Sequence, residues 1–160
     1  MLTVGDLGTA RLGALLAGFG LHLRLQGDGK AITGSFWGDP EAGIAGRDVY
    51  VHADTPVHSV LHEACHLICM PAVRRDDCFR DAGGDDLEEA AVCYLQIVLA
   101  DRLEGVGRER LLRDMDAWGY SFRLGSAAAW FERDAEDARL WLIDKQLLKN
   151  DGAPTFRLRA

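Results

Sequence analysis

Two histidines and a glutamate lie within the five-residue segment 62–66, which reads HEACH. If this segment is helical, His62 and His66 are one turn apart, so both imidazoles project from one face and can bind a single zinc ion. Glu63 is rotated by about 100° from His62, which places its carboxylate beside such an ion rather than on it. Two imidazoles on one metal, with a carboxylate next to the bound water, are the groups that metal-assisted hydrolysis requires. The sequence therefore predicts metal ligands at His62 and His66 and a catalytic proton acceptor at Glu63.

The residues around this segment are apolar on nearly every side, which is typical of a buried helix. Burying three ionisable groups in such a helix is unfavourable by several kcal/mol unless something compensates. A metal ion is the compensation that fits their spacing. The alternative is a set of hydrogen-bonded core histidines without a metal.

A third protein ligand must come from another element, because catalytic zinc usually has three protein ligands and a water. A long amphipathic helix is predicted over 85–103, and its first turn contains the adjacent Glu88 and Glu89. With Leu87 taken as the centre of the apolar face, Glu88 lies about 100° away, at the edge of that face, whereas Glu89 lies near 200° and is predicted to face water. We therefore expect Glu88 to be the third ligand. Glu89 is the first alternative, followed by Asp85 and Asp86.

Other polar side chains near the motif are candidates for substrate contacts. His58 lies one turn before His62, but it is about 12 Å from His66 along a helix axis, too far to share one ion with it. We expect His58 to face a substrate or to form a local hydrogen bond, and a plain capping or surface role is the alternative. Donors to a developing oxyanion could come from His52, Tyr94 or Tyr120, which the sequence does not rank.

The elements that must position these residues can be read from periodicity and breakers. Alternation over 21–25 and the apolar run 31–37 predict a hairpin closed by a turn at 27–30, and 48–52 predicts a third strand. Thr55 is predicted to cap a helix from Pro56 to about Met70. Further helices are predicted over 9–19, 108–118 and 126–148, with a surface loop over 73–84. We expect a single α+β domain spanning 1–160, with a small N-terminal sheet packed on the motif helix and a helical C-terminal half.

Composition excludes several function classes. Acidic residues outnumber basic ones by 25 to 18, and no cluster of Lys and Arg supplies the positive field that nucleic acid requires. The sequence contains no run of eighteen apolar residues, so we expect no membrane-spanning helix. Residues 12–21 are interpreted as an amphipathic helix rather than a signal peptide. Four cysteines in the middle third fit reduced, buried thiols better than a disulfide framework. The expected compartment is the cytoplasm.

These motifs resemble those of the zincin metallopeptidases, in particular the gluzincin branch, in which H-E-x-x-H is followed on a later helix by E-x-x-A. The matching residues are His62, Glu63, His66 and the segment 88–91, EEAA. Small domains of the ImmA/IrrE type are similar in having a strand, the motif helix and the glutamate helix in this order. The resemblance covers about residues 47–100. Cys69 and Ala72 exclude the metzincin branch, and Val92 stands where many gluzincins have an aspartate that orients a ligand histidine.

The resulting hypothesis is a zinc-dependent hydrolase, a metallopeptidase whose substrate is a peptide or protein. The strand segment 49–52 is a candidate edge for pairing an extended substrate. One rival is a non-catalytic zinc-binding module that recruits a protein partner, and another is a hydrolase of a non-peptide amide. The fourth coordination position separates the first rival from the enzyme, because structural zinc sites are closed by four protein ligands.

Overall fold

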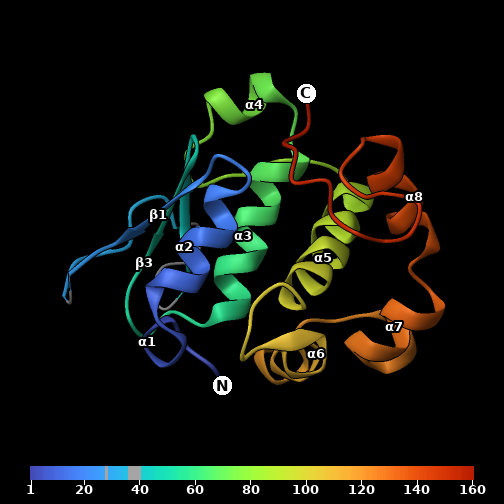
Figure 1. The fold of residues 1–160 in the computed structure, drawn as a ribbon, viewed down its shortest axis with the longest axis horizontal. Helices are drawn as coiled ribbons and strands as arrows, with labels where there is room; N and C mark the ends of the chain where they lie inside the picture. Colours follow the sequence, from blue (N-terminus) through green and yellow to red (C-terminus); the bar gives the residue numbers. More distant parts are fainter. Residues whose placement is uncertain (28, 36–40) are drawn as a thin grey trace.

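A computed structural model describes residues 1–27, 29–35 and 41–160, and shows an α+β fold in which helices flank a small sheet (Figure 1). The N-terminal part contains α1 (Val4–Leu7), α2 (Thr9–Ala17), β1 (His22–Leu25), β2 (Gly43–Ala45) and β3 (Asp48–Val51). The remainder is helical: α3 (Val57–Cys69), α4 (Ala72–Asp76), α5 (Asp86–Ala100), α6 (Gly107–Trp118), the 3-10 turn η1 (Arg123–Gly125), α7 (Ala127–Arg133) and α8 (Glu136–Asp144). The predicted fold class and the helical C-terminal half are confirmed.

The sheet has the order β1-β3-β2, with β1 parallel and β2 antiparallel to β3. The predicted hairpin is therefore wrong. Residues 31–35 are not a strand, and the rest of the predicted strand and position 28 of the turn lie outside the described residues. Because β3 is the central strand, with Val49 and Val51 fully buried, it has no free edge for a substrate. The prediction of a substrate-pairing edge at 49–52 is wrong for this reason.

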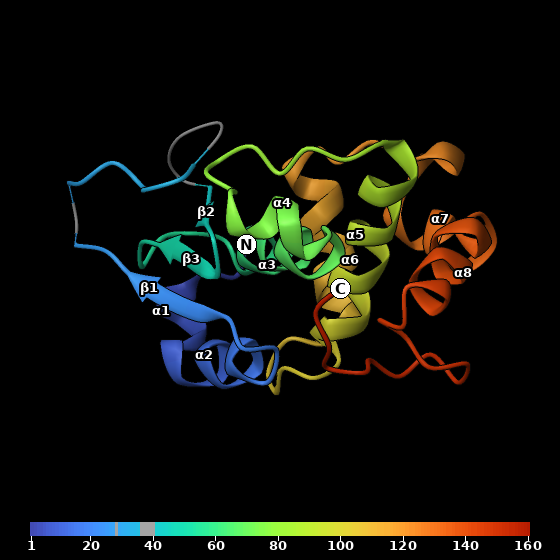
Figure 2. The same ribbon diagram turned by 90° about the horizontal axis from the view of Figure 1, so that it is seen from above.

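Helix α3 lies between the sheet and α5, and nearly all of its residues are buried (Figure 2). It begins after Pro56 and ends before Pro71, close to the predicted bounds. Thr55 does not cap it. Its hydroxyl accepts a hydrogen bond from the backbone N–H of His52 at 2.9 Å instead. The buried helix predicted for the motif is thus present, but no side chain caps its N-terminus.

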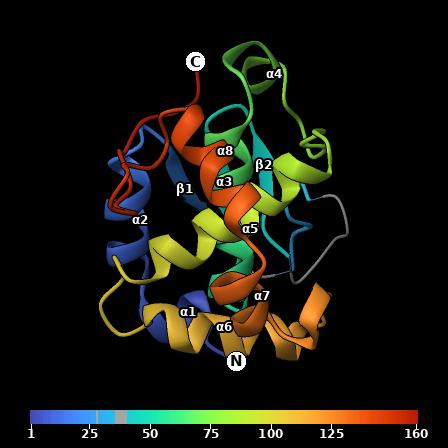
Figure 3. The ribbon, with the colours of Figure 1, turned by 90° about the vertical axis from the view of Figure 1, so that its right-hand side faces the viewer.

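Helix α5 begins at the predicted cap, because the Asp85 carboxylate accepts a hydrogen bond from the backbone N–H of Glu88 at 2.9 Å. Figure 3 shows α6, α7 and α8 around it. The single helix predicted over 126–148 is broken at Asp134 and Ala135. This break lets α7 pack on α6 while α8 packs on α5, which one straight helix could not do. The predicted loop 73–84 likewise contains α4 in its first part.

One hydrophobic core joins these layers and contains all four cysteines as buried free thiols, as predicted. Among the described residues, no helix combines the length and apolar character needed to cross a bilayer.

Candidate metal centre

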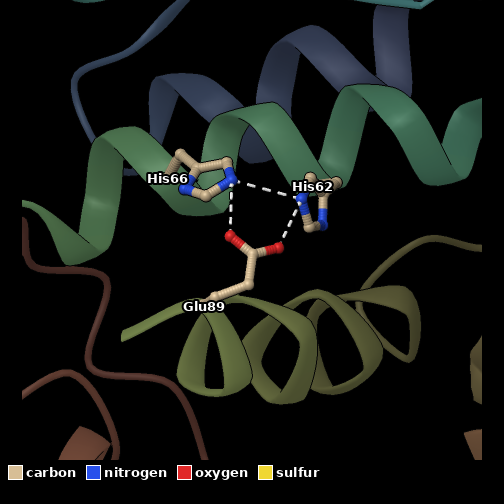
Figure 4. A group of neighbouring side chains, drawn as sticks. All are labelled: His62, His66 and Glu89. Carbon is tan, nitrogen blue, oxygen red and sulfur yellow. Dashed lines mark hydrogen bonds and ion pairs between the residues drawn. The ribbon is translucent and has the colours of Figure 1, made fainter. Parts of the chain in front are cut away.

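The two motif histidines face each other on α3 (Figure 4). The Nε2 atoms of His62 and His66 are 3.2 Å apart, and their rings meet edge to face with centroids 4.7 Å apart. Spacing by one turn on a helix produces this arrangement, as predicted. Two nitrogens at this separation require either a shared proton or a shared cation between them.

The third member of the group is Glu89, which reaches across from α5 (Figure 4). Its Oε1 lies 3.1 Å from Nε2 of His62, and its Oε2 lies 3.2 Å from Nε2 of His66. Ligand atoms bound at about 2.0–2.1 Å to a tetrahedral zinc ion lie about 3.3 Å from one another. The three side chains therefore have the donor types and the spacing of a zinc site.

Glu88, the predicted third ligand, points elsewhere. Its carboxylate forms ion pairs with Arg74 and Arg159, and the residue is only 5% exposed. Gly84 has a positive φ of 91° and packs so closely on this carboxylate that a Cβ there would overlap it. Glu88 thus fills a buried basic pocket of its own, and the glutamate beside the histidines is Glu89.

The helical phase of α5 placed the two glutamates correctly, since Glu88 is buried and the Glu89 side chain is 50% exposed, but the choice of the more buried one as the ligand was wrong. In the structure Leu87, the assumed centre of the apolar face, is 37% exposed, whereas Gln96 on the assumed water face is fully buried. The helix is packed on several sides: Gln96 is buried against α3, whereas Glu89 borders both the α3 histidines and the open pocket. A polar stripe in an otherwise apolar helix, formed by Glu89, Cys93 and Gln96 at spacings of four and seven, was the available signal.

Gln96 orients the imidazole of His62. Its Nε2 donates to the backbone carbonyl of His58 at 2.9 Å, so its Oε1 must be the atom that faces Nδ1 of His62 at 3.0 Å. Nδ1 of His62 is therefore the hydrogen-bond donor, and Nε2 is the nitrogen directed at Glu89 and His66. Outer hydrogen bonds of this kind fix the tautomer and orientation of metal-ligating histidines.

The group is strongly coupled electrostatically. Burial opposes protonation of His62, but interactions with Tyr120, Cys93 and Glu89 outweigh it, so the pKa of His62 lies well above its usual value. Burial raises the pKa of Glu89, but the hydrogen bonds and charges of His62 and His66 lower it further, so this pKa lies well below its usual value. Without a metal the group therefore holds a proton as an ion pair between His62 and Glu89. A divalent cation bound there replaces that proton.

A pocket of about 440 Å³ opens over the three side chains. Glu63 also lines this pocket, together with His62, His66 and Glu89. Burial raises the pKa of Glu63, and the neighbouring His62 and His66 oppose this shift. Glu41 also lines the pocket, and its pKa is raised by burial and by Glu63.

Part of the pocket lining is aromatic. His58 lines the pocket, and its Nδ1 lies 3.1 Å from the hydroxyl of Tyr120 while its ring packs on Trp118. Burial, followed by the charge on His62, lowers the pKa of His58 to about 4, so this ring is neutral near pH 7. Burial raises the pKa of Tyr120 to about 12, which keeps its hydroxyl protonated.

Two of the remaining candidates, Tyr94 and His52, lie outside the pocket. Tyr94 stacks on Phe131 at 4.5 Å, and His52 is buried at the end of β3. Of the tryptophans, Trp118 lines the pocket, Trp130 belongs to the core and Trp37 lies outside the described residues.

Comparison of the chain with models of known protein families, with curated proteins and with solved structures found no match. With Glu89 in the ligand position, the residue three places later is Val92, so the E-x-x-A part of the gluzincin pattern is not met.

Proposed function

We propose that this protein is a zinc-dependent hydrolase that cleaves peptide bonds. The observation that carries the proposal is the meeting of His62, His66 and Glu89 at one point beneath an open pocket that Glu63 also lines. The donor set of two imidazoles and a carboxylate is that of several catalytic zinc sites. The chain is in this respect similar to the gluzincins.

An open coordination position favours an enzyme over a structural zinc module. Among the described residues, the metal-ligating group has three members, and the pocket lies over them. Structural zinc sites are closed by four protein ligands, whereas catalytic sites keep one position for water or substrate. The arrangement therefore leaves room for a reacting molecule.

The chain's own residues have distinct tasks in the proposed reaction. Zinc, when bound, lowers the pKa of a water and polarises the scissile carbonyl. Glu63 accepts the proton of that water and passes it to the leaving amine nitrogen, and the raised pKa of Glu63 suits a proton acceptor working nearer neutral pH. Gln96 holds the ring of His62, and the aromatic part of the pocket lining excludes water from one side of the substrate.

Replacement of Glu63 by glutamine tests the mechanism. The amide keeps the shape of the side chain but cannot accept the proton, so we expect hydrolysis to fall about 10²- to 10⁴-fold while zinc is retained. The assay incubates the zinc-loaded protein with a diverse peptide mixture and detects cleavage products by mass spectrometry. Glu41→Gln, in the same pocket, is the matched control and should keep most of the activity.

Two outcomes would contradict the proposal. Undiminished hydrolysis by a zinc-loaded Glu63→Gln variant removes Glu63 from the mechanism. No cleavage of any peptide by the zinc-loaded wild type would instead favour a metal-binding module without peptidase activity.

A further inference from the structure

The C-terminal segment crosses the end of α3 at Arg159, where Figure 1 places the C-terminus. The backbone N–H of Arg159 donates to the carbonyl of Ile68 at 2.9 Å, and its Nη1 donates to the carbonyl of Cys69 at 3.1 Å. Its guanidinium also packs over the ring of Trp141, 5.1 Å from the centroid. This residue is thus tied to the last turn of the motif helix, from 90 residues away in the chain.

Arg75 completes the cap on the same helix end. Its side chain donates to the carbonyls of Leu67 and Met70, both at 2.7 Å, and to the carbonyl of Arg159 at 2.8 Å. The last carbonyls of a helix have no partner within the helix, and Pro71 prevents the helix from continuing. Two arginines therefore satisfy the carbonyls that α3 leaves open, and their positive charge suits a helix C-terminus.

The same guanidinium of Arg159 reaches the start of α5. Its Nη1 lies 3.2 Å from Oε1 of Glu88, whose side chain is 6% exposed and also pairs with Arg74. Glu88 is adjacent in sequence to Glu89, the proposed ligand from α5. Arg159 therefore joins the helix that carries both histidines to the turn that carries the glutamate.

We infer that Arg159 is a positioning residue for the metal centre, which it acts on through Glu88 and the end of α3. The inference rests on the proposed function, because it concerns the same metal site. The oxygens of Glu89 stand 3.1 and 3.2 Å from the two imidazole nitrogens, and metal bonds tolerate deviations of only a few tenths of an ångström. A rotation or retreat of the first turn of α5 would move Glu89 out of bonding range while both histidines stay in place.

The test measures zinc affinity by competition with a chromophoric chelator and the visible absorption of the Co²⁺-loaded protein. For Arg159→Ala we expect the zinc affinity to fall about tenfold or more, which is the range typical for loss of a residue that positions a metal ligand without binding the metal itself. The intensity of the Co²⁺ absorption should also change, because the ligand geometry changes. Arg159→Lys, which keeps the charge, should recover most of the affinity. Arg157 is exposed and forms no hydrogen bond or ion pair with a described residue, so Arg157→Ala is the matched control and should behave as wild type.

The outcomes separate this inference from the proposed function. Unchanged affinity and an unchanged Co²⁺ spectrum in a folded Arg159→Ala variant would overturn the positioning role. Failure of the wild type to bind zinc at all would overturn the metal site itself. Should Arg159→Ala not fold, Arg159→Gln carries the same test, because it keeps a donor for Cys69 and removes the charge that pairs with Glu88.

Discussion

Gln96 offers a sharp test of how the centre is built, because one amide determines which nitrogen of His62 is free. It accepts from Nδ1 of His62 at 3.0 Å and donates to the carbonyl of His58 at 2.9 Å and towards the hydroxyl of Tyr120 at 3.3 Å. Replacement by leucine keeps the approximate volume and removes all three contacts. The imidazole of His62 then has no acceptor for its Nδ1 proton inside a buried site.

The expected size of the effect follows from these contacts. Removing an outer partner of a metal-ligating histidine typically weakens metal binding 10- to 100-fold, which is about 1.4–2.7 kcal/mol. The carbonyl of His58 also loses the bond from Gln96, although it lies within α3 and keeps its helical partner, so the free energy of unfolding should fall by about a further 0.5–1.5 kcal/mol. Gln96→Glu keeps an acceptor for His62 and makes the ligand more basic, so its zinc affinity should stay within about tenfold of wild type.

Zinc affinity is measured by chelator competition near pH 7, and the metal-free stability by urea unfolding. Gln26→Leu is the control, because Gln26 bonds to Thr33 in the loop after β1, and it should leave zinc binding unchanged. Wild-type zinc affinity in a folded Gln96→Leu variant would refute the argument that this amide selects Nε2 of His62 for the metal.

Two further predictions concern the carboxylates and the buried imidazole. Glu89→Gln should weaken zinc binding by more than roughly 100-fold, which is the most that loss of a residue hydrogen-bonded to a ligand accounts for. Glu88→Gln should weaken it about tenfold at most. If the same competition assay gives the reverse order, Glu88 is the ligand. The pKa of His58 is lowered to about 4 in the folded protein, so the unfolded chain takes up a proton at this residue first as the pH falls. The free energy of unfolding of the metal-free protein should therefore drop by about 2 kcal/mol between pH 7 and pH 5 because of His58. His58→Gln should lack this part of the drop in urea unfolding, and equal pH dependence of the two proteins would contradict the assignment.

The sequence was informative where local patterns determine structure. Breakers and caps predicted the bounds of α3 and the start of α5 because proline and an Asp cap act on their immediate neighbours. The sheet could not be predicted in the same way. Alternation marks β1 as a strand, but it does not say that β1 pairs with β3 across more than twenty residues rather than with the next apolar run.

In the site, too, local patterns predicted some residues and tertiary contacts determined the others. The pair His62 and His66 follows from spacing on one helix, whereas the choice between Glu88 and Glu89 depends on how α5 is rotated against α3. That rotation is set by tertiary contacts, including those of Glu88 with Arg74 and Arg159. The role of the C-terminal segment had no local signal, because its partners are backbone carbonyls 90 residues away.

The most direct test of the account is anomalous diffraction at the zinc edge from crystals grown with zinc. The account predicts one ion within about 2.0–2.2 Å of Nε2 of His62, Nε2 of His66 and an oxygen of Glu89, with a fourth position facing the pocket. Crystals without an ion between these three side chains, or with the ion held by Glu88 instead, would contradict it.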